Sequence, residues 1–370
     1  MAFPELRDYP ETLDLTGVKG NKNLLKRINI YHAGYSSHEL LLSLHASDDG
    51  GIHYTAAYYG CCILAGNVWH DDEGRTCDKV DKYPFLSTSQ KADRKFRVKV
   101  PDDDILRREK YFFHVPGYKM GLYPVVPDFE HWVFPDDLEV EIPTPWCLLQ
   151  PEDSADLEDY PSRANTSCRI TGTQIRPQPL HLVPLDRARW YRKNEMVTDK
   201  LNNFRGYSMD SFVNTLYFRH DIHHLLDESI LTLLPKPDLK QGDTYSLVTH
   251  MLRRPSMSDK ATWETLARFH NVKCLPVEWI PIQFLFAHFA WSIFNNLAYT
   301  FNKEAAGVRF RMRAALGCST EASDWVREQL DERSFSDEDI TPARTGSKRK
   351  RCQVADDTDD DDNADYDYDY

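Results

Sequence analysis

The segment of residues 168–235 contains the polar side chains whose types and spacing suit chemistry better than packing. His181 lies in a short apolar run, Asn214 begins a second one, and His223 lies in a histidine-rich segment that follows. An imidazole titrates near neutral pH, so it can transfer a proton or bind a metal ion, and an amide can orient a neighbouring group through hydrogen bonds. Brought to one point, two imidazoles and one amide would form a candidate active site.

Two short strands are expected to position the first two of these residues. Residues 179–184, Pro-Leu-His-Leu-Val-Pro, are too few for a helix and have proline at both ends, which is typical of a brief strand. Residues 214–218, Asn-Thr-Leu-Tyr-Phe, mix β-branched, apolar and aromatic side chains and predict the returning strand. The pattern indicates a hairpin with His181 on one strand and Asn214 at the start of the other.

A helix is expected directly after this hairpin. Three apolar residues between positions 222 and 226 recur at the spacing of one helical face, with polar residues between them. Asp221 suits the first turn, because a carboxylate there accepts from free backbone amides and complements the helix dipole. His223 and Asp227 are four residues apart and would therefore share one side of the helix.

The order of His181, Asn214 and His223 resembles that of the HNH endonucleases of the ββα-metal (His-Me finger) type. The Cys-x-x-Thr-Gly opening at residues 168–172, the His-Leu-Val-Pro strand and the ending Asp-Ile-His-His-Leu-Leu-Asp are similar to the variant found in uncharacterised fungal proteins of this family. The resemblance covers roughly 70 of the 370 residues and implies a finger of two strands and one helix within residues 163–240.

The resemblance also implies a hydrolysis of phosphodiester bonds that uses one divalent metal ion, with Mg²⁺ favoured. His181 would be the general base, and Asn214 would hold its ring in one orientation. His223 would bind the cation, which stabilises the leaving oxygen. Asp221 and Asp227 are the further candidate ligands, since Mg²⁺ prefers oxygen donors and keeps several waters.

Two features of the chain depart from the family pattern. Many members have an acidic metal ligand immediately before the first histidine, whereas this chain has Leu180. Cys168 is followed at the third position by Thr171 rather than by a second cysteine, so no structural zinc is expected. We expect Cys168, Thr171 and Gly172 to have a structural role, with a buried thiol and a turn shaped by the Thr-Gly pair.

Other interpretations explain the same residues without catalysis. His181 between leucines can be a half-buried strand histidine, and Asn214 a turn residue before a strand. His220 and His224 are interpreted as the solvated start of a helix, and Asp227 can form an ion pair instead of binding metal. The alternative function is a catalytically inactive HNH-fold module that binds nucleic acid or protein.

Basic and aromatic side chains alternate in the long connection between His181 and Asn214, which is expected to be helical at residues 187–194 and 207–213. This composition suits contact with backbone phosphates and stacking on bases, with DNA favoured over RNA as the partner. A solvated helix face explains the same residues equally well. The candidate nucleic-acid contacts are Arg187, Arg189, Trp190, Arg192, Lys193 and, after the second strand, Arg219.

The net charge of −13 argues at first against a nucleic-acid partner, but its distribution is uneven. Nine aspartates lie between positions 356 and 369, whereas residues 160–240 contain 12 lysines and arginines against 8 acidic residues. A modest positive patch around the candidate site would steer phosphates weakly. The Lys-Arg-Lys-Arg cluster at residues 348–351 resembles a nuclear localisation signal, so a nuclear location is expected.

The cysteines and the apolar segments place the protein inside the cell and away from membranes. Eight cysteines are scattered without metal-binding spacing, which indicates reduced thiols, and the N-terminus lacks the apolar core of a signal peptide. Residues 281–299 are strongly apolar, but polar residues interrupt them and the apolar part is shorter than the ~20 residues of a membrane span. We therefore expect a buried core helix and no membrane partner.

The composition predicts an α+β protein, with the finger between a β-rich and a helical region. Strands are expected at residues 27–32, 52–59, 95–100 and 111–115, and strands or short helices at 39–45 and 61–67. Helices are expected at residues 261–271, 281–299, 303–316 and 319–333. The predicted domains are 1–147, β-rich; 148–162, linker; 163–240, finger; 241–333, helical and packed on the finger; and 334–370, a disordered tail with a basic cluster and an acidic end.

Overall fold

A computed structural model of the chain contains both helices and strands, which confirms the α+β class. The chain divides into two compact units, Met1–Arg327 and Glu328–Tyr370, and every described residue belongs to the first. The described residues are 6–10, 26–35, 39–69, 83–100, 103–118, 121–135, 142–149, 166–196, 198–199, 204–205, 208–238, 244–255, 258–277 and 279–301.

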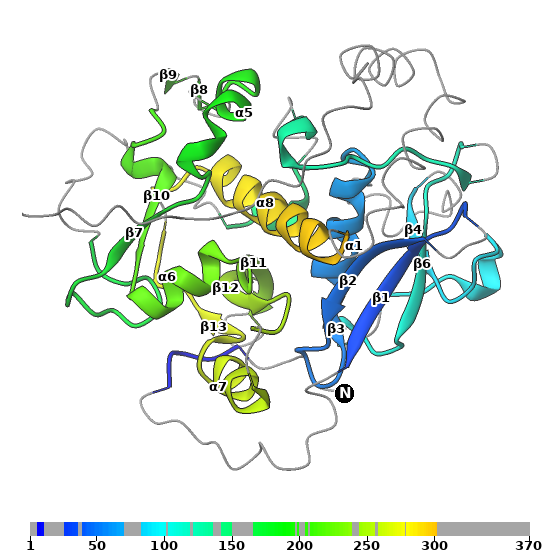
Figure 1. The fold of residues 1–370 in the computed structure, drawn as a ribbon, viewed down its shortest axis with the longest axis horizontal. Helices are drawn as coiled ribbons and strands as arrows, with labels where there is room; N and C mark the ends of the chain where they lie inside the picture. Colours follow the sequence, from blue (N-terminus) through cyan, green and yellow to red (C-terminus); the bar gives the residue numbers. More distant parts are fainter. Residues whose placement is uncertain are drawn as a thin grey trace, which may run out of the picture. The chain divides into compact units, whose positions relative to one another are not determined.

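A four-stranded sheet forms the N-terminal part of the fold, drawn in blue and cyan in Figure 1. The strand order is β2-β1-β6-β4, with β1 antiparallel to β2 and parallel to β6. On β1 every second side chain is buried, so one face of this strand covers the core. The strands are β1 (Arg27–His32), β2 (Leu40–His45), β4 (Phe85–Ser87) and β6 (Lys110–His114). The strands expected at residues 27–32 and 111–115 are confirmed, and residues 39–45 form a strand.

The strand expected at residues 52–59 is wrong, because most of this segment belongs to helix α1 (Tyr54–Leu64). Only β3 (Ile52–His53) is extended, and it pairs with β5 (Ile105–Leu106). All the residues of α1 are buried, so its sequence carries no amphipathic period and its aromatic content suggests a strand. Gly60 permits close packing, because a Cβ at this position would lie 2.9 Å from the side chain of Leu42 and 3.1 Å from that of Ile293.

The strand expected at residues 95–100 is also wrong. The segment starts with a short 3₁₀ helix, η4 (Arg94–Phe96), whose first turn is capped by Asp93 through a hydrogen bond from the Lys95 backbone N–H. Only Arg97 forms a β-bridge, with Ser87. The capping carboxylate supplies the backbone with a partner that competes with a sheet. Two further short helices follow, η6 (Phe129–His131) and α4 (Thr144–Cys147).

The hairpin and helix expected around the candidate site are present (Figure 1). β7 (Gln178–His181) pairs antiparallel with β10 (Thr215–Phe218), and α6 (His220–Asp227) begins two residues after β10. The connection is helical near residues 187–194, as expected, but of the described residues 208–213 only the last two are helical. The elements between the two strands are η8 (Leu185–Arg187), α5 (Ala188–Lys193), β8 (Thr198–Asp199), β9 (Phe204–Arg205) and η9 (Phe212–Asn214).

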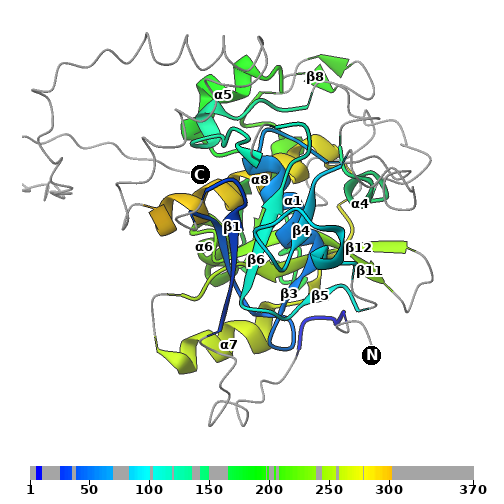
Figure 2. The same ribbon diagram turned by 90° about the vertical axis from the view of Figure 1, so that its right-hand side faces the viewer.

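A second sheet follows α6, with strand order β11-β12-β13. Two of its strands, β12 (Thr244–Met251) and β13 (Val272–Lys273), lie in the region that was expected to be helical. β11 (Leu231–Asp238) contains Pro235 and Pro237, which a strand tolerates at a sheet edge, and these prolines obscured the hairpin in the sequence. The β11–β12 hairpin is seen at the right of Figure 2. The helix expected at residues 261–271 is present as α7 (Asp259–Phe269).

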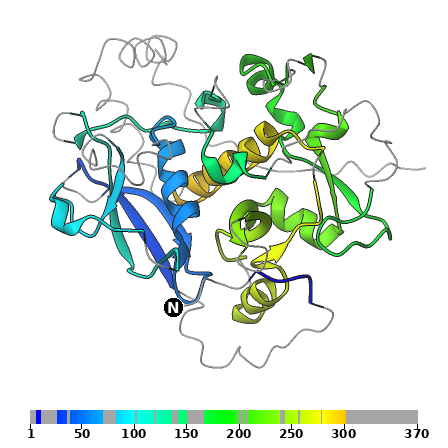
Figure 3. The ribbon, with the colours of Figure 1, turned by 180° about the vertical axis from the view of Figure 1, so that it is seen from behind.

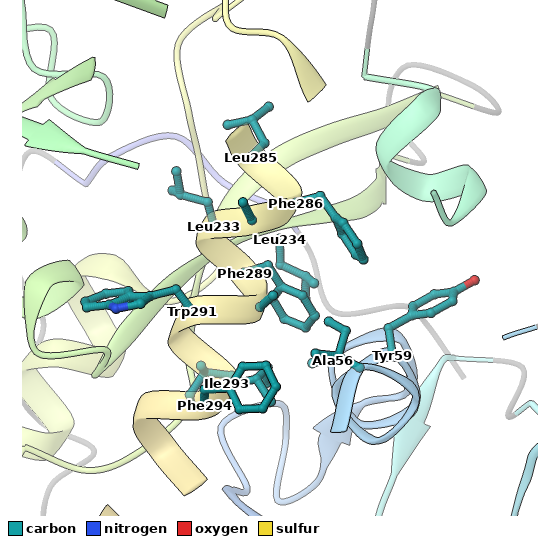
Figure 4. Close-up of a cluster of buried hydrophobic side chains, with 14 of the residues drawn as sticks. Ala56, Tyr59, Leu233, Leu234, Leu285, Phe286, Phe289, Trp291, Ile293 and Phe294 are labelled. Carbon is teal, nitrogen blue, oxygen red and sulfur yellow. The ribbon is translucent and has the colours of Figure 1, made fainter. Parts of the chain in front are cut away.

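Helix α8 (Ile282–Phe301) lies between the blue sheet and the green hairpin in Figures 1 and 3 and packs on β11, β2 and α1. Its described side chains up to residue 294 are all buried, which confirms the core helix expected at residues 281–299. Figure 4 shows Phe286 and Phe289 on the side of Ala56 and Tyr59 of α1, whereas Trp291 points away from them. No helix among the described residues has the length and apolar character needed to cross a bilayer.

One hydrophobic core links the described parts of the first unit, from Ile28 in β1 to Phe294 in α8. The proposed domain boundaries stay predictions. The linker predicted at residues 148–162 is described only up to residue 149. The segments predicted at residues 303–316, 319–333 and 334–370, including the basic cluster at 348–351, lie outside the described residues.

Candidate functional site

The β7–β10 hairpin places His181 at the edge of the core. His181 is paired with Thr215 across the hairpin, and Leu180 is paired with Leu216. The two leucines are buried, whereas the side chain of His181 is 24% exposed, because successive residues of a strand point to opposite faces. The imidazole can therefore meet solvent while the leucine before it anchors the strand.

The surroundings of His181 favour a neutral ring. Burial lowers its pKa, the carboxylate of Asp210 raises it, and His223 lowers it further, with a net shift below the ordinary value. Nε2 of His181 lies 3.7 Å from Oδ1 of Asp210, whose side chain is 80% exposed. A neutral imidazole can accept a proton, and a nearby carboxylate can balance the imidazolium that results.

His223 is fixed by a contact between the helix and the hairpin. Its Nε2 lies 3.1 Å from the carbonyl oxygen of Pro179. A carbonyl can only accept a hydrogen bond, so Nε2 carries the proton and Nδ1 of the neutral ring keeps its lone pair. His223 therefore has a ring nitrogen that can bind a cation. The neighbouring His220 is exposed and its Nδ1 contacts Gln178 at 2.8 Å, as a residue of a solvated helix start would.

The side chain of Asn214 is fully buried and contacts backbone groups rather than an imidazole. Its Oδ1 accepts from the Val183 N–H at 2.8 Å, and its Nδ2 donates to the carbonyls of Val183 at 3.1 Å and Met209 at 2.8 Å. This differs from the expectation that Asn214 orients the ring of His181, because both of its amide protons are committed to carbonyls. The residue instead fixes the chain that follows His181.

The two candidate acidic ligands on α6 differ in their contacts. Both carboxylate oxygens of Asp221 accept from Arg219, at 2.7 and 2.8 Å, and one also accepts from the Ile222 N–H at 2.9 Å. Burial alone would raise the pKa of Asp221, but the hydrogen bonds and charge of Arg219 bring it below its ordinary value. Asp221 is therefore engaged as an ion-pair partner of Arg219, and its expected role as a ligand stays a prediction. Asp227 is exposed at the last residue of α6 and stays a candidate ligand.

The expected nucleic-acid contacts include residues with structural roles. Trp190 is buried, stacks on Trp132 with ring centroids 5.6 Å apart, and donates from Nε1 to the Trp132 carbonyl at 2.7 Å. It cannot stack on a base in this conformation, so that expectation is wrong. Arg219 is engaged by Asp221 and by the hydroxyl of Tyr9 at 3.0 Å.

The basic side chains of α5 present a different surface. Arg189, Arg192 and Lys193 are exposed on α5, and Arg187 just before it is partly exposed and lies 3.4 Å from Asp186. The two aromatic residues between them, Trp190 and Tyr191, are buried on the other side of the helix, which explains why basic and aromatic residues are interleaved in the sequence. The basic residues therefore form a solvent-facing side of the helix that starts shortly after His181.

The opening Cys168-x-x-Thr171-Gly172 forms a turn that supports the hairpin. The backbone N–H of Gly172 donates to the Cys168 carbonyl at 2.9 Å, and Gly172 has a positive φ of 70°, a conformation that glycine adopts without strain. The thiol of Cys168 is buried and accepts from the Thr171 N–H at 3.4 Å. The Arg169 N–H donates to the Tyr217 carbonyl of β10 at 2.9 Å, so the turn is attached to the second strand.

A second cluster of titratable groups lies away from the hairpin. Asp48, His250 and His270 are buried, and their ligand atoms lie within 4.8 Å of one another, so the group could hold a metal ion. Sequence reasoning missed it because Asp48 is more than 200 positions from both histidines and no local spacing connects the three residues. Its complete burial leaves no room for a substrate, so the cluster is not a catalytic site for a polymer.

The hydrogen bonds of this cluster show how its charge is balanced. Lys236, which is 1% exposed, donates from Nζ to Oδ1 of Asp48 at 2.9 Å. The Met251 N–H donates to Nδ1 of His270 at 3.1 Å, so Nε2 of the neutral ring carries the proton and donates to Asp48 at 3.0 Å. Burial alone would raise the pKa of Asp48, but Lys236 and the histidines hold it well below its ordinary value. The carboxylate is thus paired with a cation from its own chain.

Comparison of the chain with protein-family models, with curated proteins and with solved structures found no match.

Proposed function

We propose that this protein is a nuclease of the HNH type, which hydrolyses phosphodiester bonds of nucleic acid with one divalent metal ion. The observation that supports this most strongly is the hairpin of β7 and β10 followed by α6, which carries His181, Asn214 and His223 in the order of that family. The same unit leaves one imidazole partly exposed and neutral and gives the other a ring nitrogen able to bind a cation.

In the proposed reaction, His181 accepts a proton from the attacking water, and Asp210 balances the charge of the imidazolium. The proposed ligands on α6 are Nδ1 of His223 and the exposed carboxylate of Asp227, which are four residues apart on the helix and would together hold the divalent ion. A bound Mg²⁺ would stabilise negative charge on the phosphate and the leaving oxygen. Asn214 holds the backbone beyond His181 in place throughout.

DNA is the substrate that we propose first, and the solvent-facing side of α5 is its proposed path. Arg189, Arg192 and Lys193 are exposed there and can neutralise phosphates without reading bases. Such contacts release counterions, so binding should weaken steeply as salt is added. The acidic charge of the whole chain does not oppose this, because it is concentrated beyond residue 355.

A catalytically inactive HNH-fold module that binds nucleic acid is the second candidate. Leu180 favours it, because this buried leucine replaces the acidic ligand that precedes the histidine in many members of the family. The module would keep the salt-dependent binding of DNA but lack any turnover.

The test is nicking of supercoiled plasmid by the purified full chain at low salt, with Mg²⁺ and with EDTA. We expect nicking only with Mg²⁺, and a loss of about 10²–10⁴-fold in rate in His181→Ala, as for removal of a general base. His224→Ala is the matched control, because His224 is an exposed histidine of the same helix, and it should retain the wild-type rate. Equal nicking by His181→Ala would overturn the assignment, and binding without nicking by the wild type would favour the inactive module.

A further inference from the structure

The two residues that follow His181 have all of their backbone polar groups paired. The Leu182 N–H donates to the Asn214 carbonyl at 2.8 Å. The N–H and the carbonyl of Val183 both bond to the side-chain amide of Asn214, at 2.8 and 3.1 Å. The fourth group, the Leu182 carbonyl, is contacted by Nδ1 of His288 at 3.1 Å. Asn214 therefore supplies three partners and a residue of α8 supplies the last one.

A histidine at position 288 stabilises the fold less than an apolar side chain would if the position served only for packing. Its side chain is fully buried, and Nε2 has no hydrogen-bond partner among the described residues. A buried nitrogen without a partner destabilises the folded state relative to an apolar side chain of similar shape. Because a carbonyl can only accept, Nδ1 of His288 carries the proton and Nε2 is the bare nitrogen. The one hydrogen bond that this ring makes is the bond to Leu182.

The ring of His288 is held firmly and stays neutral. It stacks on Trp291 of the same helix, with ring centroids 5.8 Å apart. Burial lowers its pKa to about 4, so the ring gains no proton at neutral pH and the donor at Nδ1 keeps its place. The hydrogen bond from His288 to the Leu182 carbonyl is thus kept over the pH range in which His181 would act as a base.

Helix α8 is also fastened to the chain that follows α6. Ser292, one turn after His288, accepts from the Thr232 hydroxyl at 3.1 Å and donates to the His288 carbonyl at 2.9 Å. Asn296 donates from Nδ2 to the Ser229 carbonyl at 3.1 Å. The polar side chains of α8 therefore contact the residue that follows β7 and the segment that follows α6, and β7 and α6 carry the two imidazoles of the candidate site.

We propose that His288 is a positioning residue for the general base, which acts by holding the Leu182 carbonyl while Asn214 holds the other three groups. The inference deepens the proposed function and depends on it for its catalytic part. Fixing the peptide that follows His181 limits the rotation of the chain at the base. Loss of one of the four bonds should let the imidazole move away from the attacking water, and a displacement of about 1 Å can cost on the order of 10²-fold in rate.

The experiment compares His288→Asn with His288→Gln. An asparagine amide nitrogen can take the place of Nδ1 and donate to Leu182, whereas the glutamine amide nitrogen takes the place of Nε2 and points away from it. Both variants keep a polar side chain in the same cavity, and asparagine leaves the larger void, so a general loss of packing would affect His288→Asn more than His288→Gln, opposite to the order that we expect. Ser292→Ala is the control, since it removes the buried hydrogen bonds of the Ser292 hydroxyl with Thr232 and with the His288 carbonyl, neither of which reaches Leu182.

Hydrogen exchange of the peptide that contains Leu182 and Val183, followed by mass spectrometry, reads the positioning without any turnover. We expect faster exchange there in His288→Gln, and wild-type exchange in His288→Asn and Ser292→Ala. In plasmid nicking, kcat should fall roughly 10- to 100-fold in His288→Gln with little change in KM, and His288→Asn should restore it.

Equal exchange at Leu182 and Val183 in the glutamine and asparagine variants would overturn the proposal, whether or not the wild type cleaves DNA. Wild-type kcat in His288→Gln, despite faster exchange there, would also overturn it. If the wild type does not cleave DNA but the exchange pattern is as expected, the proposed function fails while the contact of His288 with Leu182 is upheld.

Discussion

Replacement of Asn214 by aspartate separates two roles that this residue could have. The structure assigns it to the backbone of Val183 and Met209, whereas the sequence suggested that it orients the ring of His181. Asn214→Asp is nearly isosteric, so it keeps the shape and the acceptor of the side chain. It removes the two protons that Nδ2 donates to carbonyls at 3.1 and 2.8 Å and places an oxygen opposite each of those carbonyls.

The magnitude follows from those two contacts. Each buried carbonyl that loses its donor costs about 1–3 kcal/mol, so Asn214→Asp should lower the free energy of unfolding by roughly 2–6 kcal/mol. The introduced carboxyl group is buried between carbonyl oxygens, and its pKa in the folded protein should therefore lie above its unfolded value of about 3.9. At pH values between the unfolded pKa and the raised folded pKa, the folded state binds more protons than the unfolded state. The deficit relative to the wild type must then grow as pH rises from about 4 through the raised pKa.

The assay is urea unfolding of the wild type and of Asn214→Asp at several pH values between 4.5 and 8. A carboxylate that accepted a hydrogen bond from the His181 ring would behave differently, since it would raise the pKa of His181 and cost little stability at neutral pH. A deficit below about 1 kcal/mol at pH 8, or one that does not change with pH, would refute the assignment of Asn214 to the backbone.

Three further predictions concern charged groups. Lys236→Met should lower the free energy of unfolding by roughly 3–5 kcal/mol, because it leaves the buried carboxylate of Asp48 without its cation. A loss below about 1 kcal/mol in denaturant unfolding would contradict this prediction. The wild type should lose stability as pH falls from about 6.5 toward 4. Burial lowers the pKa of His250, His270 and His288 in the folded protein, so the unfolded chain binds more protons over this range. A melting temperature that stays constant between these pH values would argue against this prediction. Asp210→Asn should shift the acidic limb of the kcat/KM profile for DNA cleavage to lower pH, because Asp210 raises the pKa of His181; an unchanged limb would exclude this role.

The sequence predicted the hairpin of His181 and the helix after it well, because their signals are local. The prolines around residues 179–184 and the change to helical spacing after residue 220 each act within a few positions, and β7, β10 and α6 lie where these signals indicate. Helix α1 was mistaken for a strand because burial on all sides removes the helical period. The β11–β12 hairpin was missed because two prolines occupy an edge strand, where pairing partners rather than local preference decide the structure.

The site residues that escaped the sequence are those that act across long separations. His288 is 106 positions from Leu182, and Lys236 is 188 positions from Asp48, so no spacing rule connects either pair. Asp210 lies only four residues before Asn214, but a turn rather than a strand or helix brings it to His181, and turns leave no periodic signal. Trp190 was expected on the surface, and its burial follows from Trp132, a partner 58 positions away.

Chemical rescue by imidazole tests the central claim, that His181 takes the proton from water in a metal-dependent phosphodiester hydrolysis. The measurement is the single-turnover rate of plasmid nicking by His181→Ala with Mg²⁺, as a function of added imidazole, beside His223→Ala under the same conditions. We expect the rate of His181→Ala to rise with the concentration of neutral imidazole from a level about 10²–10⁴-fold below the wild type, and no such rise in His223→Ala. Wild-type nicking by His181→Ala without imidazole would contradict the account.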